Sequence, residues 1–121
     1  MTDPNMFLLY VDDPQGSAVF YRGLLEREPL EESRHFAKFE MRPGVMLGLW
    51  AREDVEPLPT TPGGQEIAFT VANEDEVDAL HEEWCKRGMT IALEPTRMDF
   101  GHTFVALDPD GHRLRVFAPA A

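Results

Sequence analysis

The first half of the chain shows the pattern of one strand, one helix and three more strands. The apolar run Asn5–Val11 is rich in aromatic and branched side chains, which is typical of a strand buried on both faces. Asp13 can cap a helix with Pro14 in its first turn, and Val19, Phe20 and Leu24 then recur at helical spacing as far as Leu25. Beyond the Pro29 region the pattern predicts three short strands, at residues 30–33, 35–41 and 45–51.

The second half repeats that order. The run at residues 66–71 predicts a strand, Asn73 caps the next helix, and Gly88 ends it. Trp84 belongs to the apolar stripe of that helix with Val77 and Leu80, so we assign it to the core. Strands follow at residues 90–96, 101–107 and 113–118, the last two joined by the turn at residues 108–111.

The two halves align at offsets of 60 and 67 residues, which predicts an internal duplication. Module one covers about residues 5–51, a Pro- and Gly-rich connector covers 52–64, and module two covers about 65–118. The 121 residues suit a single domain of the α+β class. We expect two βαβββ modules whose paired curved mixed sheets surround a cleft, with the helices outside, and such a cleft is a natural small-molecule site.

The charge and the cysteine content limit the classes of partner and the cellular setting that we expect. The formal net charge of −11 would repel phosphate backbones and anionic membranes, so we expect neither a nucleic-acid nor a membrane partner. Because the acidic excess is spread over both halves, we interpret it mainly as favouring solubility. The single cysteine, Cys85, permits no internal disulfide, and Met1–Pro4 lacks the basic stretch of a signal peptide. We expect a reducing, cytoplasmic setting.

Several motifs carry a family resemblance over nearly the whole chain. They are Val11-x-Asp13 followed by Phe20-Tyr21, the second opening strand at residues 66–71, and Phe104-x-x-x-Asp108-Pro109-Asp110-Gly111. In order and spacing the chain resembles the glyoxalase/bleomycin-resistance/extradiol-dioxygenase proteins, the vicinal oxygen chelate superfamily. The resemblance implies two βαβββ modules, often a homodimer, and in the enzymes a divalent metal inside the cleft.

The family's metal-ligand positions fall here on Met6, Gly48, Glu66 and Arg115. Glycine offers no ligand, methionine only a soft thioether, and arginine a positive charge, so we expect no metal and no cofactor. A Glu66–Arg115 ion pair can occupy the vacated site, or it can be an ordinary partly buried pair that serves only the fold. The four histidines show no metal-motif spacing, and no arrangement of Ser, Cys and His supports a catalytic residue.

Strand alternation defines the expected cleft wall. Phe7, Leu9 and Val11 should pack on the helix while the other residues of their strand face the cleft, where Gly48 and Ala68 leave space for a guest. Trp50 and Phe117 would stack on a planar ring, although Trp50 can also serve as packing. The predicted ligand-binding residues are Met6, Leu8, Tyr10, Met46, Gly48, Trp50, Glu66, Ala68, Arg115 and Phe117, with Arg113 on the same face.

Two function hypotheses remain. Segments such as Leu9-Tyr10-Val11 and Met46–Trp50 look most like the metal-free phenazine-antibiotic-resistance binding proteins, which implies a dimer that sequesters a planar aromatic, antibiotic-like molecule without catalysis. The alternative is a metal-dependent lyase, isomerase or oxygenase of the same superfamily with non-standard ligands. A third possibility is a scaffold domain without a ligand.

Overall fold

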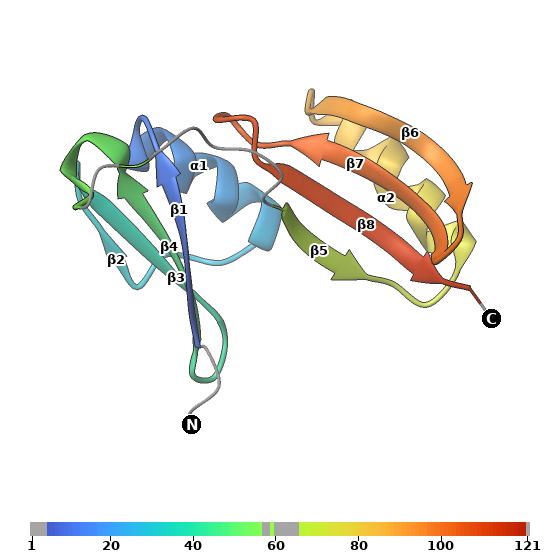
Figure 1. Ribbon diagram of the computed structural model, residues 1–121, viewed down its shortest axis with the longest axis horizontal. Coiled ribbons are helices and arrows are strands. Elements are labelled where there is room, and N and C mark those ends of the chain that lie inside the picture. Colours follow the sequence, from blue (N-terminus) through green and yellow to red (C-terminus); the bar gives the residue numbers. More distant parts are fainter. Residues whose placement is uncertain (1–4, 57–58, 60–65, 121) are drawn as a thin grey trace. The chain divides into compact units, whose positions relative to one another are not determined.

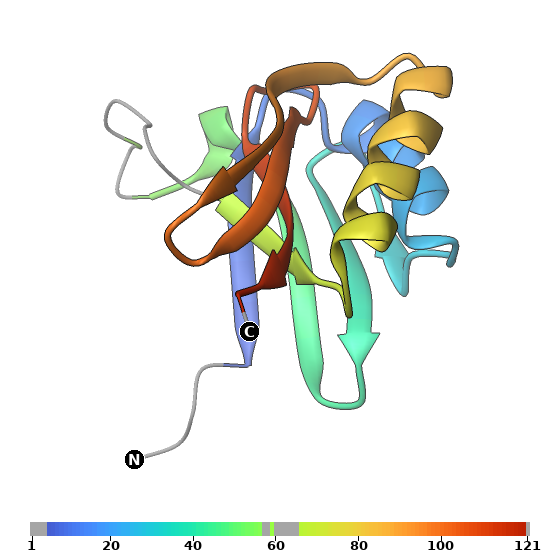
Figure 2. The ribbon, with the colours of Figure 1, turned by 90° about the vertical axis from the view of Figure 1, so that its right-hand side faces the viewer.

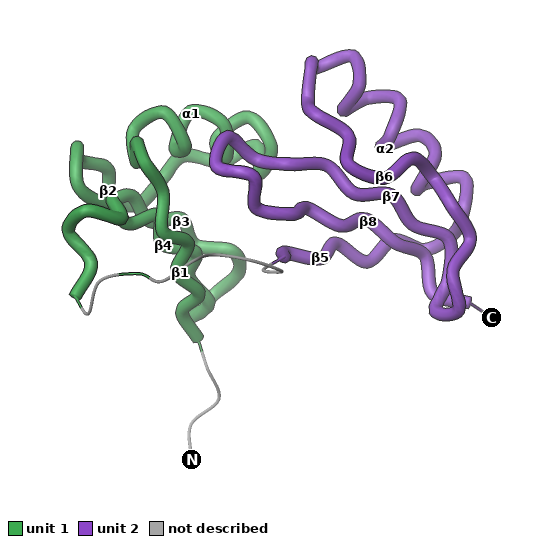
Figure 3. Tube along the Cα trace, turned by 45° about the horizontal axis from the view of Figure 1, so that its top comes forward, with its two compact units in different colours: residues 1–62 green, residues 63–121 purple. Residues whose placement is uncertain are grey.

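The computed structural model describes residues 5–56, 59 and 66–120. The chain divides into two compact units, residues 1–62 and 63–121 (Figure 3). Each unit consists of a four-stranded mixed sheet and one helix (Figure 1). The predicted connector begins as a short 3-10 helix, η1(Arg52–Asp54), while its residues 57–58 and 60–64 lie outside the described residues.

In unit 1 the first and last strands pair in parallel and the other strand pairs are antiparallel. The sheet order is β1-β4-β3-β2, so the strand that opens the chain lies at one edge, beside the strand that ends the unit. The elements are β1(Met6–Val11), α1(Pro14–Leu25), β2(Glu31–Glu32), β3(Phe36–Arg42) and β4(Val45–Ala51).

The core of unit 1 lies between its sheet and α1, which packs on β3 and β4. The helix contributes Ser17, Ala18 and Tyr21, whereas Val19 is 63% exposed. The predicted stripe was therefore wrong in phase, because the buried positions repeat from Pro14 at three- and four-residue steps and leave Val19 outside. Fully or almost fully buried on the sheet are Leu9, Val11, Ala37, Phe39, Leu47, Leu49 and Ala51.

Phe7 does not follow the predicted alternation. It shares the strand face of Leu9 and Val11, but it is 52% exposed, so the prediction that it packs against the helix is wrong. Leu9 and Val11, further along the same edge strand, are 2% and 0% exposed, so only the start of β1 lies outside the core.

Unit 2 repeats the architecture, with sheet order β5-β8-β7-β6 and α2 packed on β6, β7 and β8 (Figure 2). Trp84 is 4% exposed and makes edge contacts with the rings of Phe69 and Phe104, which confirms its assignment to the core. The elements are β5(Glu66–Thr70), α2(Glu74–Lys86), β6(Thr90–Met98), β7(Gly101–Leu107) and β8(Arg113–Pro119).

The ends of α2 match the sequence prediction, while the start of α1 does not. The Asn73 side chain accepts a hydrogen bond from the Glu76 N–H at 2.9 Å. At the other end, the N–H groups of Gly88 and Met89 donate to the carbonyls of Cys85 and Trp84, the pairing of a Schellman motif. Asp13 holds the N-cap position of α1, but its side chain makes no capping hydrogen bond.

The predicted α+β class and the doubled βαβββ order are confirmed. Strand limits differ by a few residues: the strand expected at 30–33 covers only Glu31–Glu32, and the one expected at 90–96 extends to Met98. Among the helices that the structure describes, none combines the length and apolar character needed to cross a membrane.

Candidate functional site

The sheet of unit 1 has one face covered by α1 and one open face. Strand register places six of the predicted ligand-binding residues side by side on the open face, in three parallel pairs. These pairs are Met6 with Met46, Leu8 with Gly48, and Tyr10 with Trp50. The structure therefore brings together all the site residues predicted for the first module.

Trp50 lies outside the helix-covered core of unit 1. It is half-buried, and its ring makes an edge contact with that of Tyr10, with centroids 6.4 Å apart and planes at 77°. Phe36 is its partner on the other side, in the antiparallel register of β3 and β4. Trp50 thus belongs to a group of three aromatic residues on the open face.

Gly48 has a different role from the one predicted. A Cβ atom at this position would lie 2.6 Å from Leu8 Cδ2 and 3.1 Å from two ring atoms of Phe36. The space over Gly48 is occupied by these two side chains, so the prediction that it leaves room for a guest is wrong. Its missing side chain instead leaves room for the Leu8 and Phe36 side chains over the strand.

The open face of unit 2 combines charge with aromatic side chains. Arg115 donates from Nε to Glu66 Oε2 at 2.9 Å, and the two side chains are 17% and 33% exposed. This contact confirms the predicted ion pair. It is a diagonal pair within one sheet, because the parallel register places Arg115 opposite Ala68, two residues beyond Glu66.

Two further groups hold Arg115 in place. Its Nη1 donates to Thr103 Oγ1 at 3.2 Å, and that hydroxyl, fully buried, donates in turn to the Val116 carbonyl at 2.8 Å. Phe100 lies under the guanidinium, whose Cζ is 5.5 Å from the ring centroid, and its ring meets Phe117 edge-on at 5.9 Å. A carboxylate, a hydroxyl and an aromatic face therefore fix the orientation of Arg115.

These residues do not fit a divalent metal. Gly48 supplies no donor atom, Met6 only a thioether and Arg115 a cation, and the single hard donor, the Glu66 carboxylate, is engaged by the guanidinium. Among residues 5–56, 59 and 66–120, no group of three or more His, Cys, Asp or Glu side chains is placed to hold a metal ion.

The histidines are distributed rather than clustered. Three of them contact carboxylates at separate places. The contacts are His35 with Asp54, His81 with Glu94, and His102 with Asp78.

Sequence reasoning missed Phe36, Thr103 and Phe100. The first two could have been found by extending the period of two along β3 and β7, because their neighbours Ala37 and Phe104 are plain core residues. Phe100 lies in the turn between β6 and β7, where no periodicity applies, and only the hairpin geometry brings it to Arg115.

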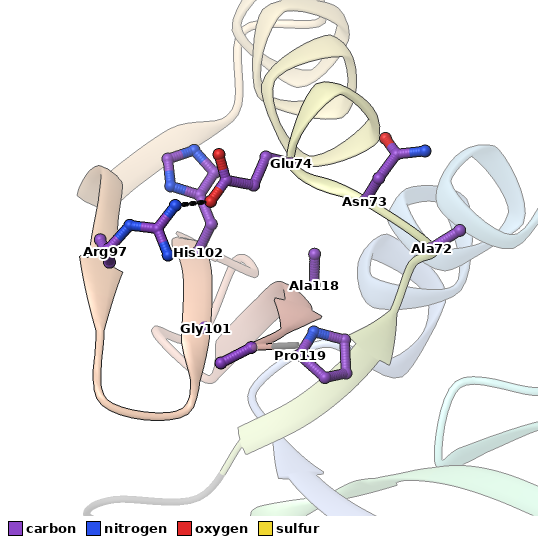
Figure 4. A pocket seen from close by; sticks show the side chains of 9 residues that line it. Ala72, Asn73, Glu74, Arg97, Gly101, His102, Ala118 and Pro119 are labelled. Carbon is purple, nitrogen blue, oxygen red and sulfur yellow. Dashed lines mark hydrogen bonds and ion pairs between the residues drawn. The ribbon is translucent and has the colours of Figure 1, made fainter.

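A separate pocket of about 320 Å³ lies at the start of α2 in unit 2, away from all the predicted site residues. Figure 4 shows the Arg97 and Glu74 side chains pointing toward each other at its side, where they form an ion pair. The pocket is lined by Ala72, Asn73, Glu74, Arg97, Gly101, His102, Ala118, Pro119 and Ala120.

Known proteins share the sequence and the fold of this chain. The chain is 32% identical over 116 residues to the phenazine antibiotic resistance protein EhpR of Enterobacter agglomerans, covering 93% of this chain and 89% of that protein. A protein of Agrobacterium tumefaciens whose structure was determined in solution is 45% identical over the full length of both chains, with a TM-score of 0.87.

More distant structures share the fold. A glyoxalase-related enzyme from Fulvimarina pelagi is 22% identical with a TM-score of 0.82, over 98% of this chain and 88% of that one. Residues 4–116 match the family model of the glyoxalase/bleomycin resistance protein/dioxygenase superfamily. This chain therefore belongs to that superfamily.

Proposed function

We propose that this protein binds a planar aromatic, antibiotic-like molecule and confers resistance to it by sequestration, without a metal and without catalysis. The observation that carries the proposal is the Arg115–Glu66 pair, which stands at positions that the resemblance assigns to metal ligands in the superfamily's enzymes, beside the Phe100 and Phe117 rings of unit 2. The 32% identity to a phenazine antibiotic resistance protein supports the same conclusion.

Binding would draw on stacking and apolar burial. The half-buried Trp50 ring, with Tyr10 against its edge, offers a face for a flat guest, and one such aromatic contact contributes about 0.5–1.5 kcal/mol beyond area burial. Met6, Leu8 and Met46 add apolar surface on the same face of unit 1. On unit 2, Ala68 and Phe117 share the open face with Arg115. Arg115, held by Glu66 and Thr103, is preset to orient polar groups of the ligand.

We further propose that the protein acts as a homodimer. The edge strand β1 supports this proposal, because its residues Met6 and Phe7 have large, exposed apolar side chains. Exposed apolar surface of this kind is typical of a protein interface. Light scattering coupled to gel filtration should then give twice the chain mass of 13.7 kDa. A value at the mass of one chain would reject the dimer.

Tryptophan fluorescence tests the binding proposal directly, because the chain has two tryptophans and one of them, Trp84, is buried on the inner side of α2. The variant Trp84→Phe leaves Trp50 as the sole reporter. Titration with phenazine should quench it saturably with a Kd well below millimolar. Trp50→Leu, measured by calorimetry, should weaken binding about two- to tenfold, the equivalent of one stacking contact.

The matched control is Trp84→Phe itself, which should bind phenazine as the unmodified chain does. If neither phenazine nor other planar tricyclic compounds bind below millimolar concentration, sequestration is rejected. Equal affinities of Trp50→Leu and the unmodified chain would instead move the ligand away from the open face of unit 1.

A further inference from the structure

The pocket at the start of α2 belongs to unit 2 alone and contains none of the predicted ligand-binding residues. Figure 4 shows Asn73 and Glu74 on the side of the helix, with Ala118 and Pro119 across the pocket from them. Its volume of about 320 Å³ is at the lower end of the range for small-molecule sites. The pocket therefore suits a small ligand.

The internal duplication makes unit 1 a reference for this pocket. At the offset of 67 residues, Ala51 of β4 corresponds to Ala118 of β8. Each alanine is paired with a histidine, His35 through a backbone hydrogen bond of 3.0 Å and His102 through strand register. After Ala51 the chain turns into η1 and buries the Val55 side chain, which is 2% exposed. Beyond the corresponding strand end, unit 1 therefore buries a branched aliphatic side chain where unit 2 has a pocket.

The polar part of the pocket is an exposed ion pair. Glu74 of α2 and Arg97 of β6 contact each other at its side, and their side chains are 48% and 67% exposed. His102 has its Nε2 engaged by Asp78 at 2.9 Å. Besides Asn73, the cap of α2, the rest of the lining is apolar: Ala72, Gly101, Ala118, Pro119 and Ala120. Because an ion pair as exposed as Glu74–Arg97 contributes little to stability, a ligand that offers a partner to each charge can replace it at little cost.

We propose that this pocket binds a free amino acid with a branched aliphatic side chain, of the size of valine or leucine. Its carboxylate binds the Arg97 guanidinium and its ammonium group binds the Glu74 carboxylate, two charge-assisted contacts in place of one. An amino acid carries both charges on one carbon atom, which suits two partners that already touch. Its side chain enters the apolar part of the pocket, as Val55 enters the core of unit 1. This site is independent of the proposed function, because it shares no residue with the open faces.

Calorimetry with four probes separates the two charges from the side chain. The probes are leucine, 4-methylpentanoate, which lacks the ammonium group, isopentylamine, which lacks the carboxylate, and glycine, which lacks the side chain. Leucine should bind the unmodified chain with a Kd below about 1 mM. The other three should bind at least about tenfold more weakly, because each loses one charge-assisted contact or the apolar burial.

Each charge of the pocket has its own variant. Arg97→Gln should weaken leucine binding about tenfold without weakening isopentylamine, and Glu74→Gln should weaken leucine equally without weakening 4-methylpentanoate. The matched control is Arg87→Gln, which removes the ion pair with Glu83 at the other end of α2 and should leave leucine binding unchanged. Because Glu74 and Arg97 are exposed, unchanged unfolding midpoints verify that both variants are folded.

Nuclear magnetic resonance locates the bound amino acid without any variant. Leucine should shift the amide signals of Gly101 and His102, which line the pocket, and leave the Trp50 indole signal in place. Failure of leucine to bind below about 10 mM, or equal affinity of Arg97→Gln, Glu74→Gln and the unmodified chain, would overturn the amino-acid site. Shifts at Trp50 without shifts in the pocket would overturn it as well. Phenazine sequestration stands or fails by its own titration.

Discussion

Single backbone positions explain how the two helices end. The last turn of α1 leads into Glu26, which has a φ of 53°, and α2 leads into Gly88, with a φ of 78°. A side chain in this left-handed region costs roughly 1–2 kcal/mol, which glycine avoids. The left-handed residue that follows the helix is therefore strained in unit 1 and unstrained in unit 2.

This contrast predicts opposite effects for two substitutions. Gly88→Ala should lower the free energy of unfolding by about 1 kcal/mol, a purely backbone effect because a Cβ at Gly88 would meet no atom within 4 Å. Glu26→Gly should raise the free energy of unfolding by up to about 1 kcal/mol, because the strain at position 26 is relieved. The gain is reduced by the greater conformational entropy of glycine in the unfolded chain. Equilibrium denaturation in urea measures both, and a loss of stability in Glu26→Gly would contradict the argument.

At the scale of elements, the turn between β7 and β8 determines where the charged strand begins. Asp108 is buried, and its Oδ1 accepts hydrogen bonds from the N–H groups of Asp110 and His112 at 2.9 and 2.8 Å. The Asp108 N–H donates to the His112 carbonyl at 3.0 Å. One carboxylate thus organises the turn that presents Arg113 and Arg115 on the open face.

Asp108→Ala should reduce the free energy of unfolding by about 1–3 kcal/mol, because two backbone N–H groups lose their acceptor inside the structure. Asp108→Asn is the matched control: it keeps Oδ1 and should cost markedly less. Thermal unfolding followed by circular dichroism compares the two. Equal losses for Ala and Asn would show that the hydrogen bonds are not what stabilises the turn.

For the whole molecule, the residues at the superfamily's ligand positions determine which chemistry is available. Three of them, Met6, Gly48 and Arg115, supply no hard donor, and the fourth, Glu66, is paired. The two units nevertheless keep the superfamily's βαβββ architecture. The fold is compatible with an ion pair at positions that the resemblance assigns to metal ligands, because its cores lie between sheet and helix, on the other face from these positions.

Protein purified without a chelator should therefore contain far less than one divalent ion per chain by elemental analysis. Treatment with EDTA should change neither the melting temperature nor the Kd for phenazine, since the proposed binding function requires no metal. About one tightly held ion per chain, with a lower melting temperature after its removal, would support the metal-dependent enzyme instead.

The sequence by itself determined which elements form and which way most side chains face. Periods of two and of 3.6, with turn residues between them, are local properties, so they predicted the doubled βαβββ order, the burial of Trp84 and the cap at Asn73. The Glu66–Arg115 pair was predictable because the resemblance to a known family placed the two residues at matching positions.

Only the tertiary structure decided which side chains meet. Phe7 is exposed at the start of β1, Gly48 is covered because Leu8 and Phe36 flank it, and Phe100 reaches Arg115 through a hairpin. Strand order and register bring these residues together from distant parts of the chain, and a local pattern contains no information about such pairing. Local periodicity determined the faces of each strand, and long-range strand pairing determined the contacts on them.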